Sequence, residues 1–223
     1  MKNLRFGKIV IGVTALLGIF GAAAAGMWHT IPCECLAISR AESVFVIDIP
    51  YQEFRTLIVR SDATKEILER DGLKLLHEEL LDLKISFAND KRPVLNALFG
   101  KSKSVVKASK RLTVGISDPN AGADEMVIIQ NSKVTPQAVS VDSASEKHCG
   151  DIVRYVSSFD ANPIAESTSV RIMIETEVSK PLIPFLHSIA QLRLDKQVQE
   201  SVEKQSIAVK QFVEDHRMLE TKK

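Results

Sequence analysis

The chain has 223 residues, of which 45% are hydrophobic and 26% charged, and its formal net charge is +1. This balance is ordinary for a globular protein that has enough apolar residues to bury a core. The near-neutral charge argues against nucleic acid as a partner, since phosphate binding needs a concentrated basic surface. Aromatic residues make up only 5%, so the stacking platforms of single-strand binders are also not expected.

An uncharged run of twenty residues, Ile9–Trp28, follows a basic start at Lys2, Arg5 and Lys8. Twenty apolar residues can cross the hydrocarbon core of a bilayer, so the run predicts a transmembrane anchor. A cleaved signal peptide is the alternative, because Ala23–Ala25 offers the small residues that precede a cleavage site. Under either reading, the positive charges before the run predict that the rest of the chain lies on the extracytoplasmic side. It is then either a single-pass membrane protein or a secreted or periplasmic one.

The remaining chain shows no internal repeat or long flexible linker, which indicates a single domain. With residues 1–28 as the membrane segment or signal peptide, residues 29–35 form a tether. Residues 36–217 form the domain, and residues 218–223 form a short tail.

The first part of the domain combines strand and helix patterns. Cys35–Ile49 is apolar on both faces, which is typical of a strand that is covered on both sides. A proline-led helix is predicted over Tyr51–Val59, and a second short helix runs over residues 61–70. Leu73–Phe87 fits both periods, and we predict a helical start that gives way to a strand near Leu80.

Strand patterns then recur with short turns between them, which predicts an antiparallel meander. The predicted strands are Ser104–Ser117, Met126–Val134, Ala138–Ser143, Ile152–Phe159 and Ser167–Ser179. The last two are joined by a predicted loop over residues 160–166.

A long periodic run from Pro181 to His216 predicts a C-terminal helix. Its apolar stripe is dense over Leu182–Leu192, so we expect this half to grip the sheet. Beyond Leu194 the stripe thins, and the exposed side of Arg193–Glu214 is the place where a protein partner would dock.

Two stretches resemble the START-like, or polyketide cyclase-like (SRPBCC), superfamily. One is the strand that leads into a proline-started helix, Val44–Phe54, and the other is the late strand Ser167–Ile172 followed by Pro181–Leu186. The resemblance spans about residues 36–217 and implies an α+β helix-grip fold. In such a fold an antiparallel curved sheet wraps around a long C-terminal helix, here preceded by an N-terminal membrane segment. It also implies an apolar cavity between sheet and helix.

The function expected from this resemblance is a membrane-tethered, exported domain that binds a lipid or other hydrophobic small molecule under the C-terminal helix. The alternative is a structural or protein-interaction module of the cell envelope that has no ligand. We expect the cavity to be lined by apolar residues of the first helix, the last strand and the final helix. These residues are Phe54, Val170, Ile172, Ile174, Phe185 and Ile189.

No residue pattern predicts catalysis, a cofactor or a metal site. His148 lies beside Cys149 in a predicted turn, but a nucleophilic thiol needs a base close in space and not merely in sequence. An enzyme is therefore less expected than a binding module. The three cysteines, Cys33, Cys35 and Cys149, match no zinc spacing. An exported compartment permits a disulfide, for which we consider Cys35 with Cys149, while three free thiols are the other option.

Overall fold

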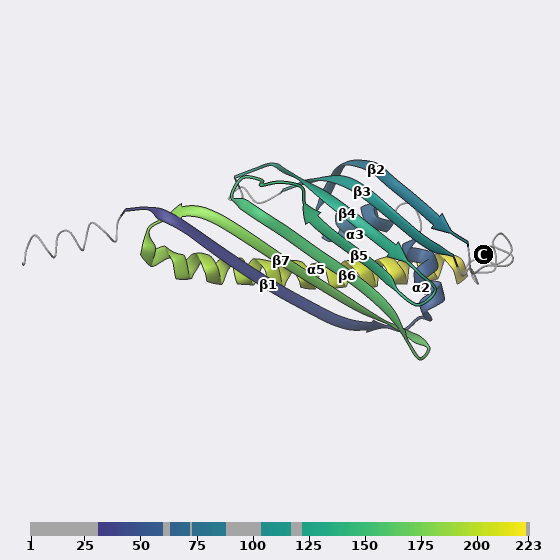
Figure 1. Ribbon diagram of the computed structural model, residues 1–223. Helices are drawn as coiled ribbons and strands as arrows, with labels where there is room; N and C mark the ends of the chain where they lie inside the picture. Colours follow the sequence, from purple (N-terminus) through teal and green to yellow (C-terminus); the bar gives the residue numbers. More distant parts are fainter. Residues whose placement is uncertain (1–30, 60–62, 72, 88–103, 117–121, 222–223) are drawn as a thin grey trace, which may run out of the picture.

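The computed structural model describes residues 31–59, 63–71, 73–87, 104–116 and 122–221 (Figure 1). The predicted membrane segment at residues 9–28 lies outside these ranges. Within them, no helix has the length and apolar character that crossing a membrane requires.

A seven-stranded sheet with the strand order β1-β7-β6-β5-β4-β3-β2 forms the body of the domain. Every neighbouring pair is antiparallel, and the sheet curves along its length (Figure 1). The strands are β1 (Cys33–Ile47), β2 (Lys74–Ser86), β3 (Val105–Gly115), β4 (Glu125–Val134), β5 (Val139–Ser145), β6 (Ile152–Ile164) and β7 (Ser167–Leu182).

The helices occur at two places in the chain, after the first strand and after the last. Between β1 and β2 come α2 (Tyr51–Ile58) and α3 (Ala63–Asp71). After β7, a 3₁₀ turn η1 (Pro184–Leu186) leads into α5 (His187–Thr221), whose 35 residues extend over about 52 Å. In Figure 1, α5 runs along the sheet from the β1 and β7 end toward α2. The predicted α+β architecture, a curved antiparallel sheet around a long C-terminal helix, is confirmed.

The pairing of β1 with β7 joins the two ends of the domain. Alternating residues of β7 point to the core, and Val170, Ile172 and Ile174 are at most 2% exposed. Between them, Arg171 points outward and donates from Nε and Nη2 to the two carboxylate oxygens of Glu42 on β1, at 2.9 and 2.8 Å. This bidentate contact lowers the pKa of Glu42. The strict alternation fixes the register of β7, since a slip of one residue would turn its apolar side chains to solvent.

The main core lies where the second half of α5 meets α2 and the sheet. Phe54 of α2 is fully buried, and Val209 and Phe212 of α5 are each 1% exposed in the same cluster. Tyr51 secures α2 by donating its hydroxyl to the carbonyl of Thr135 at 2.7 Å.

The predicted helical start of Leu73–Phe87 is wrong, because the whole of Lys74–Ser86 is strand β2. Its pairing with β3 shifts register between Leu75 and His77 and again between Leu80 and Asp82. Each shift inserts a residue into the alternation, so the leucines recur at spacings of three and four that resemble a helix.

The turn between β6 and β7 is shorter than predicted. β6 continues to Ile164, so the expected loop at residues 160–166 is reduced to the turn at Ala165, whose φ is +50°. The pairing of β5 with β6 ends at Ala161. Pro163 thus lies where one side of β6 is unpaired, a position at which a strand tolerates the missing amide.

The prediction of which half of the C-terminal helix grips the sheet is also wrong, because the second half of α5 is the buried one. Phe185 and Leu192 are 64% and 68% exposed, whereas Val198, Val202 and Phe212 are at most 3% exposed. The reason is the width of the sheet. Beyond Val178, β7 is paired with β1 alone, so the first turns of α5 face a two-stranded ribbon and the later turns face the full sheet.

Candidate ligand cavity

A cavity of about 1570 Å³ lies between the concave face of the sheet and the helices α3 and α5. Its walls are mostly apolar and come from opposite sides, with Leu112, Ile128 and Ile174 on the sheet and Leu194 and Val198 on α5. Ligand pockets are commonly 300–1,000 Å³, so this space is large enough for a molecule with a long or multi-ring apolar body.

A row of polar side chains crosses the apolar wall of the sheet. Gln130 of β4 pairs directly with Ser143 of β5, and Ser143 pairs with Ser157 of β6. All three line the cavity, and we call them the polar row. Directly paired residues on one face of a sheet have adjacent side chains, so the polar row is continuous across three strands.

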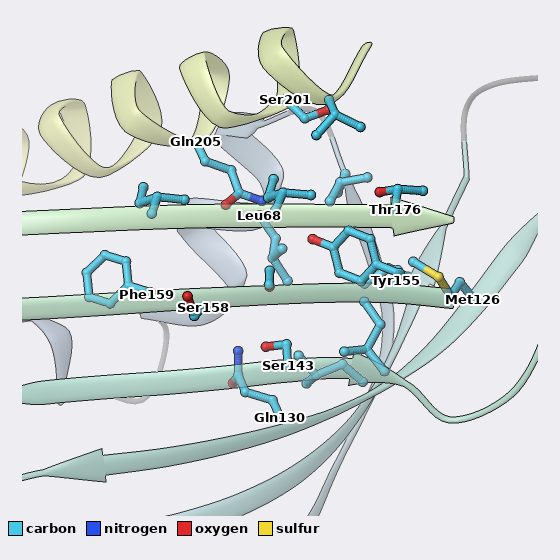
Figure 2. Close-up of a pocket in the computed structure, with 18 of the residues that line it drawn as sticks. Leu68, Met126, Gln130, Ser143, Tyr155, Ser158, Phe159, Thr176, Ser201 and Gln205 are labelled. Carbon is cyan, nitrogen blue, oxygen red and sulfur yellow. The ribbon is translucent and has the colours of Figure 1, made fainter. Parts of the chain in front are cut away.

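Further neutral polar groups face the polar row from α5 and from the neighbouring strands. Figure 2 shows Gln205 and Ser201 of α5 on one side of the cavity and Gln130 and Ser143 on the other, with Tyr155 and Thr176 nearby. Six of the lining side chains make no side-chain hydrogen bond to any residue in the part of the chain that the structure describes. They are Gln130, Ser143, Ser157, Thr176, Ser201 and Gln205. Their hydrogen-bonding capacity remains available to a bound molecule.

The charged side chains that line the cavity are ion-paired or exposed. Lys110 of β3, which pairs directly with Gln130, donates to Glu78 of β2 at 2.6 Å. Lys180 of β7 donates to Asp151, also at 2.6 Å. The remaining charged lining residues belong to α5 and are exposed: Arg193, Glu200 and Lys204. The interior therefore favours a ligand without net charge, because an unpaired charge buried there would be strongly unfavourable.

The predicted cavity residues fall into three groups. Ile172, Ile174 and Ile189 line the cavity. Val170 and Phe54 are fully buried in the main core, apart from the cavity lining. Phe185 lies on the surface, outside the lining.

Sequence reasoning missed the polar row and the walls contributed by β3 and β4. The spacing of two residues between Ile128 and Gln130, and between Val141 and Ser143, was a usable signal. It places the two residues of each pair on the same face of their strand.

The thiols are free in the structure. Cys35 lies on β1, while Cys149 precedes β6 and forms an isolated bridge with Ile152, so β7 separates the two. Two strand spacings of about 4.8 Å exceed the Cα separation that a disulfide spans, so the considered Cys35–Cys149 bridge is not formed. The Cys149 thiol instead donates to the carbonyl of Glu125 at 2.7 Å.

The surroundings of Cys149 also do not suit a nucleophile. Burial and the nearby carboxylate of Glu125 raise the pKa of this thiol, whereas a reactive cysteine needs a lowered one. Within the described ranges, no three His, Cys, Asp or Glu side chains are grouped so as to hold a metal ion.

Comparison with known proteins returns structural matches only. No protein-family profile and no curated protein matches the sequence. One similar structure is the Zhui aromatase/cyclase from Streptomyces sp. R1128, at 12% identity and a TM-score of 0.45, covering 79% of this chain and 91% of that one. A second is a START superfamily protein from Mycobacterium smegmatis, at 15% identity and a TM-score of 0.43, covering 79% and 97%. A third is SA2116 of unknown function from Staphylococcus aureus, at 8% identity and a TM-score of 0.48, covering 82% and 98%.

The topology decides the fold. β1 leads through two short helices into a meander, the last strand returns beside the first, and the C-terminal helix lies against the sheet. The fold is a START-like helix grip. In this helix-grip domain the cavity is lined by residues of the sheet, α3 and α5, and it contains several neutral polar groups.

Proposed function

We propose that the protein binds a lipid or other apolar small molecule in the cavity between the sheet and α5. The observation that carries this proposal is the size of the cavity, about 1570 Å³, together with its mainly apolar walls. Burial of apolar ligand surface supplies about 25 cal/mol per Å², which makes such a space favourable for a molecule poorly soluble in water.

The polar row narrows the chemistry of the ligand. Gln130 and Ser143 lie across the cavity from Gln205 (Figure 2), Ser157 pairs with Ser143, and none of these four side chains carries a charge. A buried polar group without a partner costs about 1–3 kcal/mol, so a purely hydrocarbon ligand that excluded water from this row would bind poorly. The proposed ligand is therefore apolar over most of its surface and carries an uncharged hydroxyl, carbonyl or amide group that reaches the polar row.

The proposal includes a membrane anchor at residues 9–28, with the domain on the extracytoplasmic side. Its support is the sequence alone, namely the uncharged run of twenty residues behind three cations. Release after cleavage near Ala25 is the alternative form of the same proposal.

The alternative function, a cell-envelope interaction module without a ligand, would use the exposed side of α5 over Arg193–Glu214. It does not account for the polar row. Among the described residues, the thiol of Cys33 lies 3.6 Å from Nε2 of His187, but neither residue lines the cavity, so the function that we propose for the cavity is binding.

The proposal is tested by photolabelling of the full chain in detergent with a long-chain alcohol that carries a diazirine. We expect covalent adducts on peptides from β4, β5 and α5, because the hydroxyl group suits the polar row. A long-chain alkylammonium of equal length should label these peptides much less, since its charge has no partner inside.

Matched variants make the result specific to the cavity. Ser143→Phe places a ring in the polar row and should abolish the adducts on β4 and α5. Ala144→Phe is the control, because Ala144 is the next residue on β5 and is exposed. Equal labelling of both variants, or adducts confined to residues 9–28, would overturn the proposal.

A further inference from the structure

Two uncharged stretches from opposite ends of the chain meet at one end of the domain. No Asp, Glu, Lys or Arg occurs from Ile9 to Cys33 or from Pro181 to Leu192. The first residue of β1, Cys33, pairs with Leu182, and its Sγ lies 3.6 Å from Nε2 of His187. We call this end, formed by residues 31–33 and 181–192, the tip. In Figure 1 it is the end at which β1 begins and α5 starts.

The tip exposes large apolar side chains. Phe185, Ile189 and Leu192 are 64%, 46% and 68% exposed, and Ile31, two residues before Cys33, is 59% exposed. The spacing of the first three, i, i+4 and i+7, places them on one face of the helical segment. Gln191 holds this segment against β1 by donating to the carbonyl of Ile38 at 2.8 Å. A clustered apolar face of this kind on a surface indicates an interaction site.

The length of the chain before the tip indicates what this face meets. Only two residues lie between Trp28, the end of the predicted membrane segment, and Ile31, and the three Cα–Cα steps from Trp28 to Ile31 span at most about 11 Å. The polar layer on each side of a bilayer is itself about 5–8 Å thick. A run that crosses the bilayer therefore keeps the tip at the membrane surface.

The cavity extends to the same end of the domain. Leu182, Leu186 and Ile189 line it, and Ile189 is also exposed, so the cavity reaches the surface at the tip. The opposite end of β7, at Ser167, lies about 50 Å away at 3.3 Å per residue over the 16 residues of the strand.

We propose that the tip docks on the lipid bilayer that holds residues 9–28, with Phe185, Ile189 and Leu192 in the interface and the cavity open toward the lipid. The occupant of this apolar face is the bilayer surface. The ligand then passes between membrane and cavity without crossing water. This inference rests on the membrane anchoring included in the proposed function.

The test uses tryptophan fluorescence of the full chain in vesicles of phosphatidylcholine with brominated or unbrominated acyl chains. Trp28 is the only tryptophan in the wild type, so its quenching by bromine reports on the anchor alone. In a Trp28→Phe background, Phe185→Trp and Leu192→Trp report on the tip. Ile164→Trp is the matched control, because Ile164 is 51% exposed at the far end of β6.

We expect brominated lipid to quench the wild type, the Phe185→Trp variant and the Leu192→Trp variant strongly, and to leave the Ile164→Trp variant bright. If the wild type is quenched but both tip variants stay bright, anchoring stands and docking is refuted. If the wild type itself stays bright, the anchor fails and the docking proposal fails with it. Equal quenching of the Ile164→Trp and Phe185→Trp variants would overturn docking through the tip.

Discussion

The second half of α5 should determine the stability of the domain, and Phe212→Ala tests this most sharply. The side chain of Phe212 is 1% exposed within the main core, and its ring centroid lies 4.4 Å from that of His216. Removing a buried phenylalanine side chain costs about 3–5 kcal/mol, because transfer energy is lost and a cavity remains. For a domain of this size that corresponds to a fall in Tm of about 6–20 °C.

Leu192→Ala is the matched control on the same helix. Leu192 is 68% exposed, and exposed substitutions change stability by only about 0.5 kcal/mol. Urea denaturation of each full-length variant, followed by far-ultraviolet circular dichroism, gives the two free energies of unfolding. A loss for Leu192→Ala as large as that for Phe212→Ala would refute the reasoning, since it would mean that the first turns of α5 grip the sheet. By the same geometry, a chain truncated after Leu194 should unfold. Such a truncation could not separate the loss of a partner on α5 from the loss of the fold.

Two further predictions concern titratable groups. Burial raises the pKa of Tyr51 from 10.0 to about 12, so the stability it contributes is complete below pH 10 and is lost as the pH rises through 12. Phenolate absorbance should show one tyrosine that ionises late in the wild type and is absent from Tyr51→Phe; ionisation of both tyrosines near pH 10 in the folded protein would contradict the burial. For the thiols, alkylation of the native protein should modify exposed Cys33 first. Cys35 should react slowly because it is buried, and Cys149 because its pKa is raised. Mass spectrometry under non-reducing conditions should find no Cys35–Cys149 peptide, and its recovery would contradict the strand separation.

The elements that the sequence predicts best are those whose local pattern agrees with their surroundings. β7 alternates strictly because it lies between two strands and under α5, and α2 begins directly after Pro50. β2 was misread because its two register shifts break the alternation. Such bulges depend on pairing with β3, and a single strand's sequence does not show them.

The helix and the cavity show a second limit of prediction from the sequence. The apolar stripe over Leu182–Leu192 is real, yet whether it is buried depends on how many strands lie opposite, and that number follows from strand lengths elsewhere in the chain. The polar row has the same origin. Gln130, Ser143 and Ser157 belong to three different strands, so no local sequence pattern relates them. Only the registers of β4, β5 and β6 bring them side by side.

The central claim is that the cavity holds a neutral, mostly apolar molecule, and native mass spectrometry of the full chain released from membranes in mild detergent tests it most directly. We predict a bound mass that organic extraction removes and identifies as an uncharged lipid-like compound. It should persist in Ala144→Phe and be lost in Ser143→Phe. A folded wild-type protein that carries no added mass, and that the diazirine alcohol also fails to label in its cavity, would contradict the account.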